Sequence, residues 1–214
     1  MTFVKICGIT NSEDAANAIR LGADALGFNF YKKSSRYLSP ESAEKIIEIL
    51  PPHVLAVGVF VDSTAEEIIE ITRRVKLQAI QLHGTDPLLP LSLPAGESQS
   101  IKIIRAIRLS PEVDKDLLEQ AASIADLLLI DSFVSGEFGG TGEVTPFKKL
   151  IETIPSTLLT KTLIAGGLNP ENVGEAIRAV TPFGVDVASG VEERPGKKSS
   201  SKMEKFIGEA KGKL

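Results

Sequence analysis

Short apolar segments alternate along the chain with longer segments in which apolar and charged residues mix at helical spacing. Most of the apolar segments lack a regular polar alternation, which is typical of strands buried on both faces, as in a parallel sheet. Eight segments are therefore predicted to be strands: VKICGI (4–9), ALGFNF (25–30), LAVGVFV (55–61), AIQLHG (79–84), IKIIRAI (101–107), LLLID (127–131), TLIAGG (162–167) and VDVASG (185–190).

The longer segments predict amphipathic helices with recognisable ends. Gly22 closes the first helix. At 39–40, 110–111 and 169–170 a capping residue is followed by proline, so the proline stands in the first turn of the helix. Prolines within 85–100 break any long helix, so we expect the helical unit there to be short or degraded. The predicted helices cover residues 12–22, 40–50, 64–75, 111–124, 170–180 and 202–211.

This order of elements predicts the fold class. Alternating strands and helices imply parallel strands joined by right-handed crossovers. Eight such units in 214 residues match a compact α/β fold of the (β/α)8 TIM barrel type, and without a visible linker we expect one domain over residues 1–214. The alternative is a doubly wound open sheet, which often carries Gly-x-Gly-x-x-Gly after its first strand, whereas CGITNS stands here.

Composition narrows the class of protein. The formal net charge of −4 gives no basic footprint, so nucleic acid is not the expected partner. No apolar stretch approaches the roughly 18 residues of a membrane span, and the start MTFVKICGIT lacks a signal-peptide pattern. The single cysteine suits a reducing compartment, so we expect a cytoplasmic protein. With only two histidines, a Cys/His zinc cluster is nearly excluded, and no metal site is predicted.

Polar residues gather where the predicted strands end. In a (β/α)8 barrel the active site lies at the carboxyl ends of the strands, so these residues are expected to meet at one mouth. The opposite strand ends carry little obvious chemistry. Following the strands in order, the carboxyl-end candidates are Cys7, Lys32, Lys33, Arg36, Asp62, Gln81, His83, Lys102, Arg105, Asp131, Gly166, Gly167, Asp186, Ser189 and Gly190.

Glycine-rich loops follow three of the last strands. AGGLN (165–169) and ASGVE (188–192) close strands 7 and 8, where this fold often binds phosphate; the alternative is that their glycines serve tight turns. GEFGGTGE (136–143) follows strand 6 and is either a cover that closes on ligand or a surface loop. The two loops after strands 7 and 8 together favour an anion site.

Four side chains have two interpretations each. Arg36 is either part of a solvated basic loop or a fork of donors for a carboxylate. Cys7 is either a buried small hydrophobe or a reactive thiol. Asp131 either caps a turn or, because desolvation would raise its pKa, holds a proton as an acid facing Cys7 across the mouth. Asp186 either holds a substrate hydroxyl or bonds the loop backbone.

Seven segments together resemble the phosphoribosylanthranilate isomerase family of tryptophan biosynthesis. The resemblance covers nearly the whole chain in order, and it implies a (β/α)8 barrel that needs no cofactor or metal and binds a small-molecule sugar phosphate. We expect the chain to be a monomer or a homodimer. The segments are KICGIT, GFNFYKKSSRYLSP, VGVFVD, QLHG, GGTG, AGGLNPENV and VDVASGVEERPGKK.

The resemblance also implies a reaction and roles. The reaction is the Amadori rearrangement of N-(5-phosphoribosyl)anthranilate to 1-(2-carboxyphenylamino)-1-deoxyribulose 5-phosphate. By resemblance, Cys7 is the general base, Asp131 is the general acid and Arg36 binds the anthranilate carboxylate. The other expected substrate contacts are His83 and Asp186, with the phosphate at Gly166, Gly167, Ser189 and Gly190.

Two departures from the family pattern and two alternatives remain. EVTPFKKL replaces the usual Phe-Asp-Trp after GGTG, and Ser199 replaces an aspartate after PGKK; Thr145 and Ser199 are competent helix caps.

A related histidine-biosynthesis enzyme uses aspartate where Cys7 stands, and a non-catalytic sugar-phosphate binding barrel would need neither Cys7 nor Asp131. A reactive Cys7 needs a lowered thiol pKa, and the sequence names no single neighbour that lowers it; Lys5, two residues before Cys7, should share its face of the strand.

Overall fold

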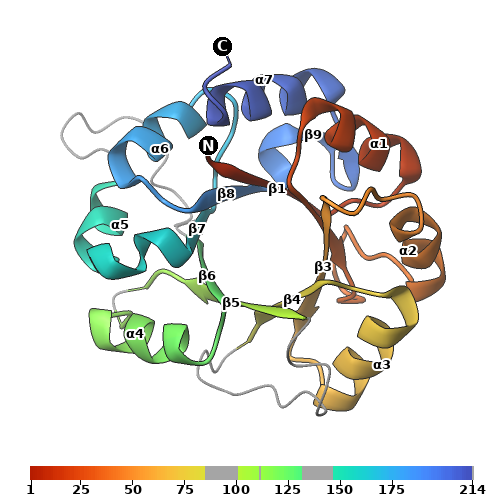
Figure 1. Ribbon diagram of the computed structural model, residues 1–214, viewed down its shortest axis with the longest axis horizontal. Coiled ribbons are helices and arrows are strands. Elements are labelled where there is room, and N and C mark those ends of the chain that lie inside the picture. Colours follow the sequence, from red (N-terminus) through yellow and green to blue (C-terminus); the bar gives the residue numbers. More distant parts are fainter. Residues whose placement is uncertain (85–100, 111, 132–146, 214) are drawn as a thin grey trace.

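Eight parallel strands close into a barrel in sequence order, with helices around the outside (Figure 1). The computed structural model describes residues 1–84, 101–110, 112–131 and 147–213. The first strand pairs in parallel with both the second and the last, so the predicted (β/α)8 barrel is confirmed and the open sheet is wrong. The strands are β1 (Phe3–Cys7), β2 (Ala25–Asn29), β3 (Leu55–Val61), β4 (Ala79–His83), β5 (Lys102–Arg108), β6 (Leu127–Asp131), β7 (Thr162–Ala165) and β8 (Gly184–Val187).

The remaining elements follow the strands as expected, with one addition. An antiparallel hairpin of β9 (Glu192–Arg194) and β10 (Lys197–Lys198) follows β8 and was not predicted. The degraded helix expected within 85–100, the loop 136–143 and the Thr145 cap all lie outside the described residues. The helices are α1 (Ser12–Leu21), α2 (Pro40–Ile47), α3 (Ala65–Val75), α4 (Lys115–Ser123), α5 (Lys148–Thr153), η1 (Ser156–Lys161), α6 (Val173–Val180), η2 (Ser189–Val191) and α7 (Ser200–Ala210).

Helix caps explain several of these boundaries. Asn11, Ser39, Thr64 and Ser199 each accept a hydrogen bond from a backbone N–H in the first turn of the helix that follows. Gly22 ends α1 in the left-handed conformation at φ 99°. The expected caps at Ser39 and at the substituted Ser199, and the expected end at Gly22, are therefore confirmed.

Two predicted helix starts are wrong. Helix α4 begins at Lys115 because the side chain of Asp114 accepts from Leu117 N and provides the cap, so the start expected at 110–111 is too early. Helix α6 begins at Val173 because Asn169 makes a turn of its own: its side-chain oxygen accepts from the backbone N–H groups two and three residues on.

Alternation along the strands separates two apolar cores. One core lies between the barrel and the surrounding helices, and the other fills the barrel interior. Leu129 belongs to the interior core, and Asp131 follows it by two residues, so the carboxylate points to the same side at the strand's end. The interior core consists of Ala25, Val57, Ala79, Ile104, Ala106, Leu129, Leu163 and Ala165.

The last helix completes the ring of helices. In Figure 1, α7 lies beside α1 and α6, so the two ends of the chain come together. Lys211, just after α7, donates to the Asp24 carboxylate at 2.8 Å, which ties the helix to the start of β2. None of the helices in the described ranges combines the length and the apolarity that a membrane crossing requires.

Candidate active site

One cavity of about 330 Å³ opens at the carboxyl ends of the strands. It also takes in Asn29 and Gln81, of which Asn29 went unnoticed in the sequence. Asn29 had a usable signal, because it lies four residues after the inward-facing Ala25 on the same strand. The structure brings to this cavity the predicted residues Cys7, Arg36, His83, Asp131, Gly166, Gly167, Asp186, Ser189 and Gly190. The other carboxyl-end candidates Lys32, Lys33, Asp62, Lys102 and Arg105 do not line it. Lys102 is wrong as a carboxyl-end residue, because it begins β5 at the opposite end of the barrel, where it pairs with Asp126.

Cys7 lies beside a buried ion pair. Lys5 Nζ donates to Asp186 Oδ1 at 2.7 Å and also hydrogen-bonds the Cys7 side chain. Gly27 on β2 makes the room for both groups, since a Cβ there would lie 2.8 Å from the Cys7 sulfur and 3.2 Å from Lys5 Nζ. The expectation that Lys5 shares the face of Cys7 is therefore confirmed, and Asp186 turns out to be its partner.

Burial raises the pKa of the Cys7 thiol above its usual value. The Lys5 ammonium lowers the Cys7 pKa, but it does not outweigh burial, and the Asp186 carboxylate adds to the rise. Burial lowers the pKa of Lys5, yet Asp186 and Cys7 together carry it above its usual value, so Lys5 stays charged. The lowered thiol pKa that a reactive Cys7 was expected to need is thus wrong, and Lys5 only limits the rise.

Replacing Lys5 with methionine is expected to raise the Cys7 pKa further, because the cation that favours the thiolate is lost. Cys7 is the single cysteine, so the pH dependence of iodoacetamide alkylation reports this thiol alone. The alkylation midpoint should move to higher pH in Lys5→Met. It should move back in Lys5→Met/Asp186→Asn, which also removes the carboxylate that opposes the thiolate. An unchanged midpoint in both variants would contradict the role of Lys5.

His83 and Asp131 line the other side of the thiol's cavity, at the ends of β4 and β6. Burial lowers the pKa of His83, while the Asp131 charge acts in the opposite direction, which places the two groups within electrostatic reach. His83 Nε2 lies 2.5 Å from the Gln81 amide nitrogen. Burial therefore favours the neutral imidazole, which lies against Gln81, and Asp131 is the carboxyl group on this side of the cavity.

The loops after β7 and β8 meet at the glycines. Gly166 and Gly167 have φ angles of 88° and 68°, in the left-handed region that favours glycine. A Cβ at Gly190 would run into the carbonyl oxygen of Leu168, so the two loops touch only because residue 190 lacks a side chain. Asn172 Nδ2 donates to Gly167 O at 3.0 Å and fixes the first loop.

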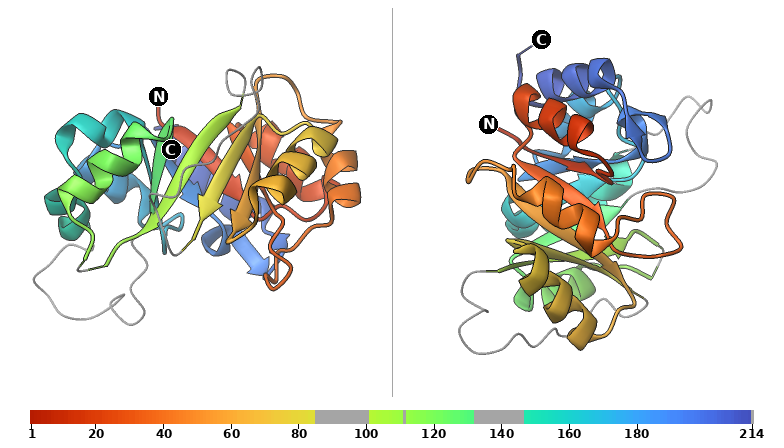
Figure 2. Two further views of the ribbon diagram at one scale, coloured as in Figure 1. Left: turned by 90° about the horizontal axis from the view of Figure 1, so that it is seen from below. Right: turned by 90° about the vertical axis from the view of Figure 1, so that its right-hand side faces the viewer.

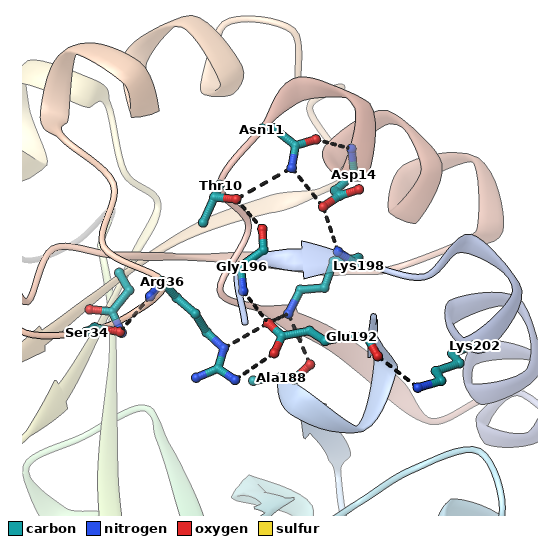
Figure 3. A network of polar contacts seen from close by, with 11 residues as sticks. Thr10, Asn11, Asp14, Ser34, Arg36, Ala188, Glu192, Gly196, Lys198 and Lys202 are labelled. Carbon is teal, nitrogen blue, oxygen red and sulfur yellow. Dashed lines mark hydrogen bonds and ion pairs between the residues drawn. The ribbon is translucent and has the colours of Figure 1, made fainter. Parts of the chain in front are cut away.

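Arg36 is held by a partner that the sequence did not reveal. Its Nε and Nη2 donate to the two carboxylate oxygens of Glu192 at 2.8 and 2.6 Å (Figure 3). The side chain lies over Gly8, where a Cβ would meet Arg36 Cδ at 2.5 Å, and Gly8 has a φ of 76°. Glu192 follows the loop 188–191, and nothing in its local sequence marks it as a partner of a residue 156 positions away.

Across the described ranges 1–84, 101–110, 112–131 and 147–213, no group of three or more His, Cys, Asp or Glu side chains is arranged to hold a metal ion. The ionisable side chains that face the cavity are instead a thiol, two carboxyls, an imidazole and a guanidinium, which are groups suited to proton transfer and anion binding.

A closed (β/α)8 barrel with a polar cavity at the carboxyl ends of its strands has the architecture of a barrel enzyme. The family model described as N-(5'-phosphoribosyl)anthranilate (PRA) isomerase matches residues 4–209. The chain belongs to this family, and its reaction is the isomerisation of phosphoribosylanthranilate in tryptophan biosynthesis.

Individual relatives agree over the full length. The chain is 42% identical over 212 residues to the N-(5'-phosphoribosyl)anthranilate isomerase of Thermotoga maritima, covering 99% of this chain and 100% of that one. It is 43% identical over 216 residues to the Chlorobaculum parvum isomerase, with 97% and 94% covered.

Solved structures of such isomerases are similar as well. The Thermotoga maritima structure aligns with a TM-score of 0.80 at 41% identity, covering 99% of this chain and 100% of that one. The Thermus thermophilus structure gives 0.77 at 36% identity, with 99% of both chains covered. A further structure, of the isomerase in complex with reduced 1-(o-carboxyphenylamino)-1-deoxyribulose 5-phosphate, gives 0.77 at 41% identity, covering 99% and 100%.

Proposed function

We propose that Cys7 and Asp131 carry out the proton transfers of the rearrangement as base and acid. Arg36 and the glycine loops would hold the two anionic ends of the substrate. The observation that supports this proposal is that one cavity collects a thiol, a carboxyl, a guanidinium and both glycine loops. These groups come from opposite sides of the barrel, so a ligand that fills the cavity would lie between them.

The chemistry needs one acid and one base. Asp131 donates a proton to the ribose ring oxygen as the bond from this oxygen to C1 breaks, and the nitrogen lone pair forms a protonated C=N bond. The Cys7 thiolate then removes the C2 proton; the C–H electron pair forms C1=C2, and the C=N π electrons return to nitrogen. The resulting enolamine tautomerises to the ketone. Each transfer by a positioned group contributes roughly 10²–10⁴-fold.

The substrate carries an anion at each end, and the cavity offers a site for each. Arginine presents planar, paired donors that suit the anthranilate carboxylate. The loops holding Gly166, Gly167, Ser189 and Gly190 follow β7 and β8, where this fold commonly binds phosphate. We expect His83 and Asp186 to contact the ribose hydroxyls from the cavity wall. The reduced product analogue seen with a relative should therefore bind here in one orientation.

The proposal also covers the domain organisation, the location, the oligomeric state and the cofactor requirement of the chain. We infer a single domain over residues 1–214, a cytoplasmic location, and a monomer or a homodimer, the latter because one similar structure is of monomers generated from a dimeric Thermotoga maritima isomerase. The reaction exchanges oxidation level between two carbons of one molecule, so we propose that it needs no cofactor.

Turnover of freshly made phosphoribosylanthranilate is expected to be unchanged after exhaustive dialysis against EDTA. The proposed proton transfers by side chains need no metal, because they use neither an electron carrier nor a Lewis acid. Loss of substrate fluorescence measures the rate. If dialysis abolished activity and a divalent cation restored it, the side-chain mechanism would be wrong.

A further inference from the structure

We propose that Glu192 is a positioning residue for substrate recognition, which holds the Arg36 guanidinium in the orientation that receives the anthranilate carboxylate. The inference rests on the proposed role of Arg36 and extends it to the groups that surround it. Figure 3 shows the arrangement: Glu192 lies between Arg36 on one side and Lys198 on the other.

The contact between the two side chains is a paired one. Arg36 Nε and Nη2 each donate to one oxygen of the Glu192 carboxylate. The Arg36 side chain is 24% exposed and lines the cavity, while the Glu192 side chain is 4% exposed. Paired N–H···O bonds fix the plane of a guanidinium as well as its position. The Glu192 carboxylate therefore sets the direction in which the remaining arginine donors point.

Glu192 is itself held firmly. Its Oε1 accepts from Lys198 Nζ at 2.9 Å and from Gly196 N at 3.3 Å, and its backbone oxygen accepts from Lys202 Nζ at 2.8 Å. Lys198 N in turn donates to Asp14 Oδ2 at 2.8 Å on α1. Figure 2 shows the hairpin that carries these groups projecting beyond the end of the barrel to which the strand arrows point. The hairpin thus serves as a rigid support for the arginine.

The cluster of Arg36, Glu192 and Lys198 keeps a hydrogen-bond donor and positive charge for a carboxylate ligand. Arg36 Nη1 has no hydrogen-bond partner among the described residues, so it is free to bind a carboxylate oxygen. The two cations Arg36 and Lys198 face the single carboxylate of Glu192, which leaves net positive charge. Burial lowers the pKa of Lys198 below its usual value, and the bond to Glu192 offsets only part of that change. Because Glu192 already holds the long Arg36 side chain, Arg36 loses less rotamer freedom when a ligand binds.

The competing explanation is that the network only stabilises the hairpin. The two explanations differ in which ligands they affect. A positioning role acts on ligands that carry the carboxylate, whereas a structural role acts on all ligands of the cavity alike. Two probes separate them: reduced 1-(o-carboxyphenylamino)-1-deoxyribulose 5-phosphate, and reduced 1-phenylamino-1-deoxyribulose 5-phosphate, which lacks only the carboxylate.

Calorimetric titration of both probes into Glu192→Gln tests the inference. We expect the carboxylated probe to bind roughly tenfold more weakly or worse, because a charged hydrogen bond loses its alignment, and the other probe to stay within about twofold. Glu193→Gln, the same change at an exposed neighbour on β9, is the matched control and should alter neither probe. Glu192→Asp keeps a counter-charge for Lys198, shortens the support and should give a smaller selective loss.

A double-mutant cycle with Arg36→Ala completes the test. In the Arg36→Ala background, Glu192→Gln should cause no further selective loss. If Arg36→Ala weakens both probes equally, the proposed role of Arg36 fails. If Arg36→Ala is selective but Glu192→Gln and Glu192→Asp weaken both probes equally or neither, the inference about Glu192 is overturned. Should Glu192→Gln fail to fold, Glu192→Asp decides alone.

Discussion

Replacing Cys7 with alanine is expected to lower kcat by roughly 10²–10⁴-fold, the contribution of one positioned proton-transfer group. Cys7 lies at the end of β1, lines the cavity and receives a hydrogen bond from the buried Lys5 ammonium. Alanine removes the sulfur and should leave the barrel strand and the glycine loops after β7 and β8 in place. Binding of the reduced product analogue should therefore stay within about threefold, since the groups proposed to hold its two anionic ends do not include residue 7.

Two further measurements sharpen this expectation. Cys7→Ser keeps the size of the side chain, but a hydroxyl is a far weaker acid than a thiol, so its kcat should be nearly as low as that of alanine. Alkylation of the single cysteine by iodoacetamide should inactivate the protein, and the product analogue should slow this loss. If Cys7→Ala retained near-normal kcat, another group would be the base.

The fold and the composition of the site could be predicted from the sequence because both follow local rules. Each predicted site residue other than Arg36 lies within the last two residues of a strand or within three residues after one, and parallel pairing brings all eight strand ends to the same mouth. Positions such as Cys7 and Asp131 then face inward by the two-residue period of a strand. Arg36 lies further along the loop after β2, where the strand period says nothing of its direction, and only the resemblance to a family motif gave it a definite ligand.

The contacts that tune these residues could not be predicted. Lys5 pairs with Asp186 across 181 positions of the chain, and Arg36 pairs with Glu192 across 156. No periodicity or motif connects residues so far apart, because only the closure of β8 against β1 and the path of the hairpin bring them together. The net direction of the Cys7 pKa depends on the same closure, since burial and Lys5 act against each other.

Both ion pairs share a design in which a buried carboxylate restrains a cation next to the cavity. Lys5 is fully buried and acts on the thiol, whereas Arg36 is partly exposed and is available to a ligand. A buried pair is weak evidence for stability, because the loss of hydration offsets much of the attraction. In the proposed mechanism their value lies in fixing the direction of charge at two points of the substrate, near the reacting carbon and near the carboxylate.

Asp131→Asn is expected to lower kcat by roughly 10²–10⁴-fold, because an amide of the same shape has no acidic proton to give to the ring oxygen. Binding of the reduced product analogue should change little. Asp126→Asn makes the same change just before the opposite end of β6, where the side chain is 38% exposed and pairs with Lys102, and it should leave kcat near the wild-type value.

Deuterium at ribose C2 distinguishes the acid from the base. If Asp131 serves ring opening, Asp131→Asn makes that earlier step limit the rate, so the isotope effect on kcat should shrink towards one. Cys7→Ala instead slows removal of the C2 proton, so its isotope effect should grow. The opposite pattern would exchange the two roles, and equal effects in both variants would mean that Cys7 and Asp131 act on a single shared step. The isotope effects therefore test the order of the proton transfers, which the loss of rate alone leaves open.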